Sequence, residues 1–130
     1  MQNPDQRRVK IIEGDVLDAT ALASAMKAGV RRLIFISSMG IYGEVPGERY
    51  RSALDPYRDA AAVIEAADLD YIILRPGWFT RDEEVSYQVT QKGQPFKGHD
   101  VSLNSLSDLI VKLALTPGME CRHSLGVSAR

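Results

Sequence analysis

Apolar residues along this chain gather in short runs that predict buried β-strands. The runs cover residues 8–14, residues 31–38 and residues 71–74. The centre of the second run and the whole of the third are apolar at consecutive positions, which is typical of strands covered by helices on both faces. A fourth, weaker strand is predicted over residues 124–128.

Between these runs, apolar residues recur at the three- to four-residue spacing of helices. Helices are predicted over residues 19–28, residues 55–67 and residues 104–115. The second begins at Asp55-Pro56, where an aspartate can cap the helix and a proline fits its first position. Its predicted buried face consists of Ala60, Val63, Ile64 and Ala67.

The remaining segments are expected to be irregular. Residues 39–54 carry three glycines and a proline, and residues 80–100 are polar. Strands that alternate with helices in this order predict an α/β fold with a parallel sheet. A single domain over residues 1–130 is expected from this length.

Composition narrows the range of functions. The chain has 130 residues, 45% of them hydrophobic, and a net charge of −1, so we expect no nucleic-acid or membrane partner. Its first five residues are too polar for a secretory signal. The single cysteine, Cys121, rules out an internal disulfide and suits the cytoplasm. His99 and His123 have no ligand partners at metal-binding spacing, so no metal is expected.

Small, polar or rigid residues follow three of the predicted strands directly. The strand ends read Gly14-Asp15-Val16, Ser37-Ser38-Met39-Gly40 and Arg75-Pro76-Gly77. Ligands of open parallel sheets bind beyond the carboxyl ends of the strands, so these segments predict a binding edge. Each can equally be an ordinary turn, since every strand must end.

The same segments carry a family resemblance. The sequences GDVLD at residues 14–18, RRLIFISSMGIYG at residues 31–43 and DYIILRPGWF at residues 70–79 stand in the expected order. Together they resemble the NAD(P)-binding, atypical short-chain dehydrogenase/reductase families, which include NmrA-like proteins and relatives of flavin and biliverdin reductases. The resemblance implies a Rossmann-like parallel sheet flanked by helices, with NAD(P)(H) as the cofactor.

By this resemblance, the cofactor lies along the three strand ends. The residues expected to hold it are Asp15, Val16, Ser37, Ser38, Pro76 and Gly77. The first pair would lie beside the adenine, the serines on the nicotinamide side, and the last pair against the nicotinamide ribose. Ser38 also matches the position of the catalytic serine in extended relatives.

The chain departs from the family at its start. The family opens with a Gly-rich strand-turn-helix that holds the pyrophosphate at a helix N-terminus, and no such motif occurs here. Only residues 19–30 separate the first two matching segments, where the family has a further strand and most of a helix. The resemblance therefore implies either a truncated protein or a sequence from which segments are missing.

A second departure concerns catalysis. Relatives with the standard mechanism use Tyr-x-x-x-Lys, and here the segment has Tyr57 but Ala61 in place of the lysine. Without a nearby cation, a phenol keeps a pKa of about 10 and is a poor base at neutral pH. Tyr57 is thus a candidate catalytic residue without its partner, and the alternative is a tyrosine that packs in the first turn of a helix.

Three aromatic residues are candidates for a substrate pocket: Tyr42, Trp78 and Phe79. Tyr42 can instead pack beneath its loop, and the other two can instead close the core.

The leading hypothesis is an NAD(P)(H)-binding oxidoreductase that reduces a flavin, a quinone or another small planar acceptor. Solvent can supply the proton for such a reaction, so the missing lysine is tolerable. The alternative is a non-catalytic, NmrA-like sensor that binds the dinucleotide and regulates a partner. A third hypothesis is a fragment that keeps the fold without binding. A small-molecule acceptor is the expected partner, and a homodimer is left open.

Overall fold

A four-stranded sheet forms the centre of the molecule in the computed structural model, which describes Lys27, Gly29 and residues 31–130. Its strand order is β1-β2-β6-β4, and β3 and β5 form a separate parallel pair. The elements in chain order are β1 (Arg32–Ile36), η1 (Ser52–Leu54), α2 (Asp55–Ala66), β2 (Asp70–Pro76), β3 (Trp78–Thr80), β4 (Gln88–Gln91), β5 (Asp100–Ser102), α3 (Leu103–Leu115) and β6 (His123–Ser128).

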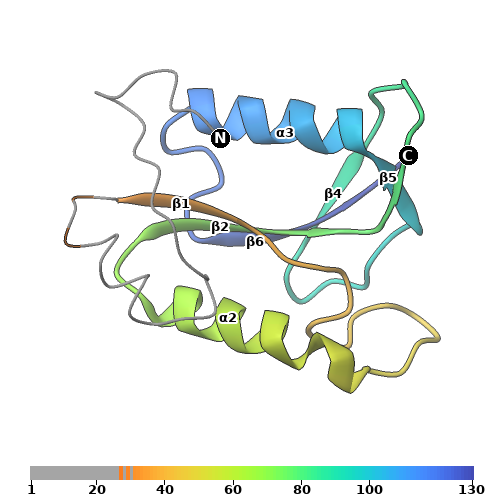
Figure 1. The fold of residues 1–130 in the computed structure, drawn as a ribbon, viewed down its shortest axis with the longest axis horizontal. Coiled ribbons are helices and arrows are strands. Elements are labelled where there is room, and N and C mark those ends of the chain that lie inside the picture. The colour runs from red at the N-terminus through yellow and green to blue at the C-terminus, as the bar shows by residue number, and fades with distance from the viewer. Residues whose placement is uncertain (1–26, 28, 30) are drawn as a thin grey trace.

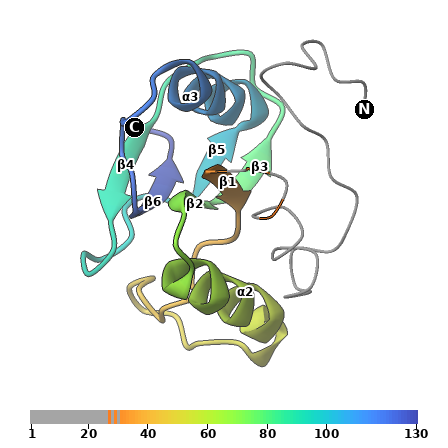
Figure 2. The ribbon, with the colours of Figure 1, turned by 90° about the vertical axis from the view of Figure 1, so that its left-hand side faces the viewer.

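The sheet lies between two helices, with α2 on one face and α3 on the other (Figures 1 and 2). β1 and β2 pair in parallel, with Phe35 opposite Ile73, and β6 pairs in parallel with the other side of β2. β4 is antiparallel to β6. The predicted α/β fold with a parallel sheet is confirmed, with one antiparallel strand at its edge.

The two faces of β2 explain the two hydrophobic cores. Tyr71 and Ile73 belong to the core under α2, whereas Ile72 and Leu74 belong to the core under α3. Successive side chains of a strand point to opposite faces, so a strand that is covered on both sides must be apolar at every position. The continuous apolar run of residues 71–74 is therefore a consequence of this central place in the sheet.

Helix α2 begins differently from the prediction. Asp55 is its first residue rather than its cap, because the 3₁₀ turn η1 runs directly into it and Leu54 occupies the capping position without a side-chain bond. The Asp55 carboxylate instead accepts a hydrogen bond from the Tyr50 hydroxyl at 2.5 Å. Val63, expected on the buried face, is 41% exposed, and Ala61 is buried in its place.

Helix α3 has a side-chain cap and a strongly apolar inner face. The Ser102 hydroxyl accepts a hydrogen bond from the Ser105 backbone nitrogen, which satisfies one of the free N–H groups at the helix start. Its buried leucines are Leu106, Leu109 and Leu113, and they pack on β2 and β6. No helix in the described part of the chain is both long and apolar enough to cross a membrane.

Other predictions need correction or lie outside the described residues. The segment 80–100 was expected to be irregular, yet it contains β4, and the last strand, expected to be weak, is the inner strand β6. Ile34 lies in the run 31–38 that predicts a buried strand, and it is only half-buried. The predicted strand at 8–14 lies outside the described residues, as does the predicted helix at 19–28 apart from Lys27.

Gly77 connects β2 to β3 where two backbone segments approach closely. A Cβ atom added to Gly77 would lie 2.4 Å from the carbonyl oxygen of His99. The Gly77 backbone N–H donates a hydrogen bond to the Val127 carbonyl at 3.0 Å. Any side chain would push the backbone of β5 away. Glycine is therefore required here by packing within the fold.

We expect Gly77→Ala to lower the free energy of unfolding by about 2 kcal/mol or more, because the clash is with backbone. The matched control is Gly126→Ala, whose Cβ would lie 2.9 Å from the buried Phe96 ring, a contact with a side chain rather than with backbone. Urea denaturation measures both losses. A Gly77→Ala loss no larger than that of the control would contradict this account of the junction.

Candidate functional site

The carboxyl ends of β1 and β2 lie side by side. The Ser37 backbone nitrogen donates to the Leu74 carbonyl at 2.7 Å, and the Met39 nitrogen donates to the Pro76 carbonyl at 3.1 Å. Two of the three segments predicted to meet at one edge of the sheet therefore do so. Asp15 and Val16, which form the third, lie outside the described residues.

The two serines at this edge differ in their bonding. Ser37 is 7% exposed, and its hydroxyl has no hydrogen-bond partner within the described part of the chain. Ser38 is half-buried, and its hydroxyl donates to the Met39 carbonyl at 3.0 Å, which leaves its lone pairs free to accept. A buried hydroxyl without a partner costs roughly 1–3 kcal/mol, so Ser37 is an unusual polar group to find at this edge.

Arg75 is a residue of this region whose role the sequence did not predict. Its side chain is fully buried at the end of β2, on the face covered by α2. Its guanidinium pairs with the Glu44 carboxylate at 2.5 Å and donates to the Ser124 hydroxyl at 3.0 Å. It also donates to the backbone carbonyls of Thr90 and Ser124. One side chain thereby joins β2, β4, β6 and the loop that follows β1.

The loop over residues 39–54 is fixed through Glu44. The second carboxylate oxygen of Glu44 accepts a hydrogen bond from the Tyr42 backbone nitrogen at 3.2 Å. The backbone carbonyl of Glu44 accepts one from the Phe96 backbone nitrogen at 3.0 Å. The loop is therefore tied to the sheet by an ion pair and to the segment before β5 by a backbone bond.

Trp78 and Phe79 lie directly after this edge, in the short strand β3. They are 59% and 55% exposed, so they do not close the core, which was one of the two expectations for them. The Arg51 guanidinium lies 5.8 Å from the centre of the Trp78 ring, within the range of a cation–π contact. The Trp78 ring is thus accessible to a ligand beside the strand ends.

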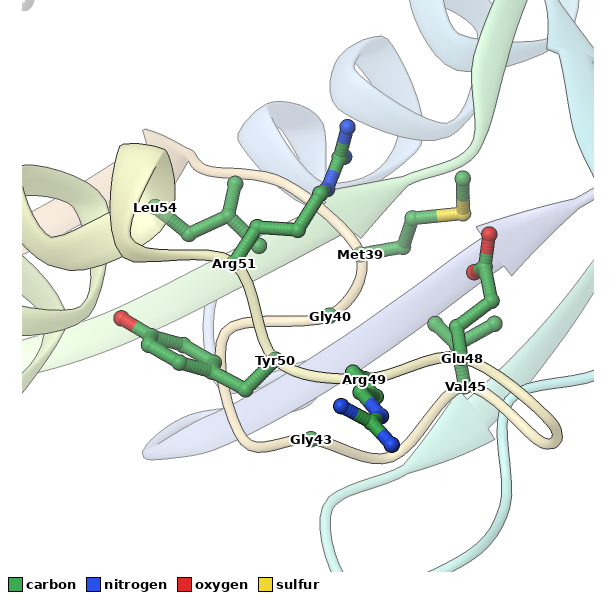
Figure 3. Close-up of a pocket in the computed structure, with 9 residues that line it drawn as sticks. All are labelled: Met39, Gly40, Gly43, Val45, Glu48, Arg49, Tyr50, Arg51 and Leu54. Atoms are coloured by element: carbon green, nitrogen blue, oxygen red, sulfur yellow. The ribbon is translucent and has the colours of Figure 1, made fainter.

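A small cavity lies inside the loop itself (Figure 3). Its volume of about 20 Å³ has room for roughly one water molecule and none for a planar ring or a dinucleotide. Its lining residues are Met39, Gly40, Gly43, Val45, Glu48, Arg49, Tyr50, Arg51 and Leu54. A ligand of the strand ends must therefore bind at the surface beside this loop rather than within it.

A comparison with known families identifies the domain. A family model described as NAD(P)H-binding matches residues 21–117, which is more than half of the chain. The chain belongs to this NAD(P)H-binding family. The predicted cofactor, NAD(P)(H), is the one for which the family is named.

Solved structures agree with this assignment. A Rossmann-fold NAD(P)-binding family protein from Shigella flexneri is 39% identical, with a TM-score of 0.72 over 89% of this chain and 56% of its own. A short-chain dehydrogenase/reductase from Veillonella parvula, crystallised with NADP, is 26% identical, with a TM-score of 0.74 over 88% of this chain and 59% of its own. The resemblance to NAD(P)-binding short-chain dehydrogenases/reductases and the Rossmann-like fold are thus confirmed.

ChuY from Escherichia coli O157:H7, described as an anaerobillin reductase, shares the fold at 24% identity, with a TM-score of 0.70 over 85% of this chain and 55% of its own. The chain spans less than two thirds of the length of each of these three proteins. No curated protein matches it significantly.

The Tyr-x-x-x-Lys pattern of catalytic relatives has no functional counterpart in α2. Tyr57 lies in the first turn of the helix and is 44% exposed, and Ala61, at the lysine position, is fully buried in the core. Arg58 lies over the Tyr50 ring at 4.9 Å, and its guanidinium is 3.4 Å from the Asp55 carboxylate. Among the described residues, therefore, no lysine or arginine side chain is paired with the Tyr57 hydroxyl.

Tyr42 is built into a polar cluster. Its hydroxyl donates to the Glu65 carboxylate at 2.9 Å and lies 2.9 Å from the Ser124 hydroxyl. Burial, together with the nearby Glu65 carboxylate, raises the pKa of Tyr42 to about 12. Tyr42 therefore keeps its proton at neutral pH and is no general base. Its place in a substrate pocket stays a prediction, as do the cofactor roles of the strand-end residues.

We expect the stabilising effect of the Tyr42 hydroxyl to disappear in alkali. Because its pKa in the fold, about 12, is above the ordinary value of about 10, the unfolded chain loses the proton first as the pH rises. Tyr42→Phe should therefore be less stable than wild type by roughly 1 kcal/mol at about pH 9, and this difference should shrink toward about pH 11. Urea denaturation across this range measures it, and a constant difference would refute the assignment.

Proposed function

We propose that this chain is the NAD(P)(H)-binding part of an oxidoreductase that reduces a small planar acceptor, of which flavins and quinones are the model compounds. The observation that carries the proposal is the edge where β1 and β2 end. There a buried serine hydroxyl without a partner, a second serine and two exposed aromatic residues are brought together on adjacent segments.

These residues fit the cofactor of the family. The Ser37 hydroxyl would bond a polar group on the nicotinamide side, and Pro76 and Gly77 would pack against the ribose. When bound, NAD(P)H supplies a hydride to the acceptor. Asp15 and Val16 remain the proposed contacts of the adenine.

Residues beside the cofactor would position the acceptor. Ser38 has lone pairs that can accept a hydrogen bond, and the exposed ring of Trp78 offers a surface for a planar molecule. The reduced acceptor gains one proton with the hydride, and we propose that it comes from water, because Tyr57 has no lysine and the aromatic surface is open to solvent. Orientation is then the contribution of the protein to the rate.

One observation favours a second candidate, a non-catalytic NmrA-like sensor. Ala61 is buried at the position where catalytic relatives carry lysine, so the usual acid–base pair has no place to form. A protein that binds the dinucleotide only to signal its level needs no such pair. The two candidates differ in turnover: a reductase oxidises NADH or NADPH in the presence of an acceptor, whereas a sensor binds either without oxidising it.

We expect Ser38→Ala to reduce the rate of NAD(P)H oxidation more than Tyr57→Phe does. A hydrogen bond to acceptor or carboxamide contributes about 0.5 to 1.5 kcal/mol, so the serine variant should lose roughly several-fold to tenfold in kcat/KM. The tyrosine variant removes an exposed phenol with no part in proton transfer and should change little.

The rates are measured by the loss of absorbance of NADH and NADPH, each with menadione and with FMN as acceptor. A Tyr57→Phe variant without turnover, beside an unaffected Ser38→Ala variant, would restore a tyrosine-based mechanism. Binding of the dinucleotide by wild type without oxidation by either acceptor would support the sensor instead.

A further inference from the structure

Arg51 places a free positive charge beside the exposed aromatic surface. Its guanidinium lies over the Trp78 ring, and Arg51 is exposed and makes no ion pair with any described residue. No described residue accepts a hydrogen bond from the Arg51 side chain, and its N–H donors match the two oxygens of a carboxylate or a phosphate. The side chain is thus arranged to bind an anion next to a ring.

No described carboxylate forms an ion pair with Arg51. Asp82 accepts a hydrogen bond from the Thr80 hydroxyl at 3.1 Å. Asp100, although opposite Trp78 in the β3–β5 pair, lines a separate depression with Glu84 and Arg130. Glu48, on the same loop as Arg51, forms no ion pair with it. The charge of Arg51 is therefore available to a ligand.

The position of Arg51 is set by the fold. Its carbonyl accepts the Leu54 nitrogen at the start of η1, at 2.9 Å, and the loop that carries it is anchored to the sheet through Glu44 and Arg75. The side chain can be changed without removing either of these bonds. Figure 3 shows the Arg51 and Arg49 side chains leaving the loop in opposite directions, so Arg49 offers the same charge on the same loop without the contact to Trp78.

We propose that the acceptor is a planar molecule with an anionic oxygen group, a carboxylate or a phosphate, and that Arg51 binds this group while the ring lies against Trp78. This inference rests on the proposed function, because it assigns the substrate class of the same site. It makes Arg51 a residue that selects between charged and neutral acceptors with the same ring.

FMN and riboflavin test the proposal, because they share one ring system and differ by a phosphate. Trp78 is the single tryptophan of the chain, so the quenching of its fluorescence reports flavin binding at this surface directly and without cofactor. We expect wild type to bind FMN about five- to tenfold more tightly than riboflavin. Arg51→Gln should abolish this preference and leave riboflavin binding unchanged, and Arg49→Gln should retain most of it.

Salt gives an independent measurement, since screening weakens an exposed ion pair and leaves ring stacking intact. The FMN preference of wild type should therefore fall as salt is added. Equal binding of the two flavins by wild type, an equal loss of preference in both arginine variants, or no quenching by either flavin would overturn the proposal.

Failure of the proposed function looks different, namely no oxidation of NADH or NADPH with any acceptor. Equal turnover of FMN and riboflavin by wild type would leave that function standing and overturn only the role of Arg51.

Discussion

A fully buried guanidinium, that of Arg75, lies where four segments of this fold meet. Burying a charge is costly unless it is paired and hydrogen-bonded, and Arg75 meets both conditions through Glu44, Ser124 and Thr90. Loss of one partner from such a pair typically costs 3–5 kcal/mol, because the other charge is left uncompensated. The end of β2, the start of β6, the strand β4 and the loop after β1 are therefore joined by a single side chain.

This constraint explains how an open edge can present an ordered site. The loop over residues 39–54 buries Ile41 and Leu54 in the core under α2, and the Arg75–Glu44 pair and the Phe96 backbone bond fix it to the sheet as well. With the loop in place, Ser37 is buried at the end of β1 and Arg51 reaches Trp78. Functional groups that are held by packed elements act more precisely than groups on free loops, which supports the proposal that the cofactor and acceptor bind here.

Periodicity predicted the elements that bury a continuous apolar face. β1, β2, α2 and α3 were all expected within a few residues of their bounds, because their apolar positions follow the spacing of a strand or a helix. β4 was missed because it is an edge strand with one buried position, Thr90, in a polar segment. The first turn of α2 was misread because Asp55 bonds to Tyr50 rather than to the helix backbone.

The candidate site was predictable only in part, because some of its contacts join residues that are far apart in the sequence. Parallel strands end at the same edge, so the meeting of the Ser37–Ser38 and Pro76–Gly77 segments followed from the fold class. The partners of Arg75 are 15, 31 and 49 residues away in sequence, and no local pattern marks an arginine after an apolar run as a buried one. Likewise, the exposure of Trp78 and Phe79 depends on what packs over β3. The sequence alone did not decide whether these two residues line a pocket or close the core.

The central claim is that the cofactor binds at the carboxyl ends of β1 and β2. The most direct test is to follow the NMR chemical shifts of the backbone amides during titration with NADPH. A chain of 14.4 kDa is well suited to such spectra. We expect the largest shifts at residues 37–40 and 77–79, with the amides of Leu69, Asp70 and Arg122 at the opposite ends of the strands unchanged. Shifts confined to that opposite edge, or no shifts at any NADPH concentration, would contradict the account.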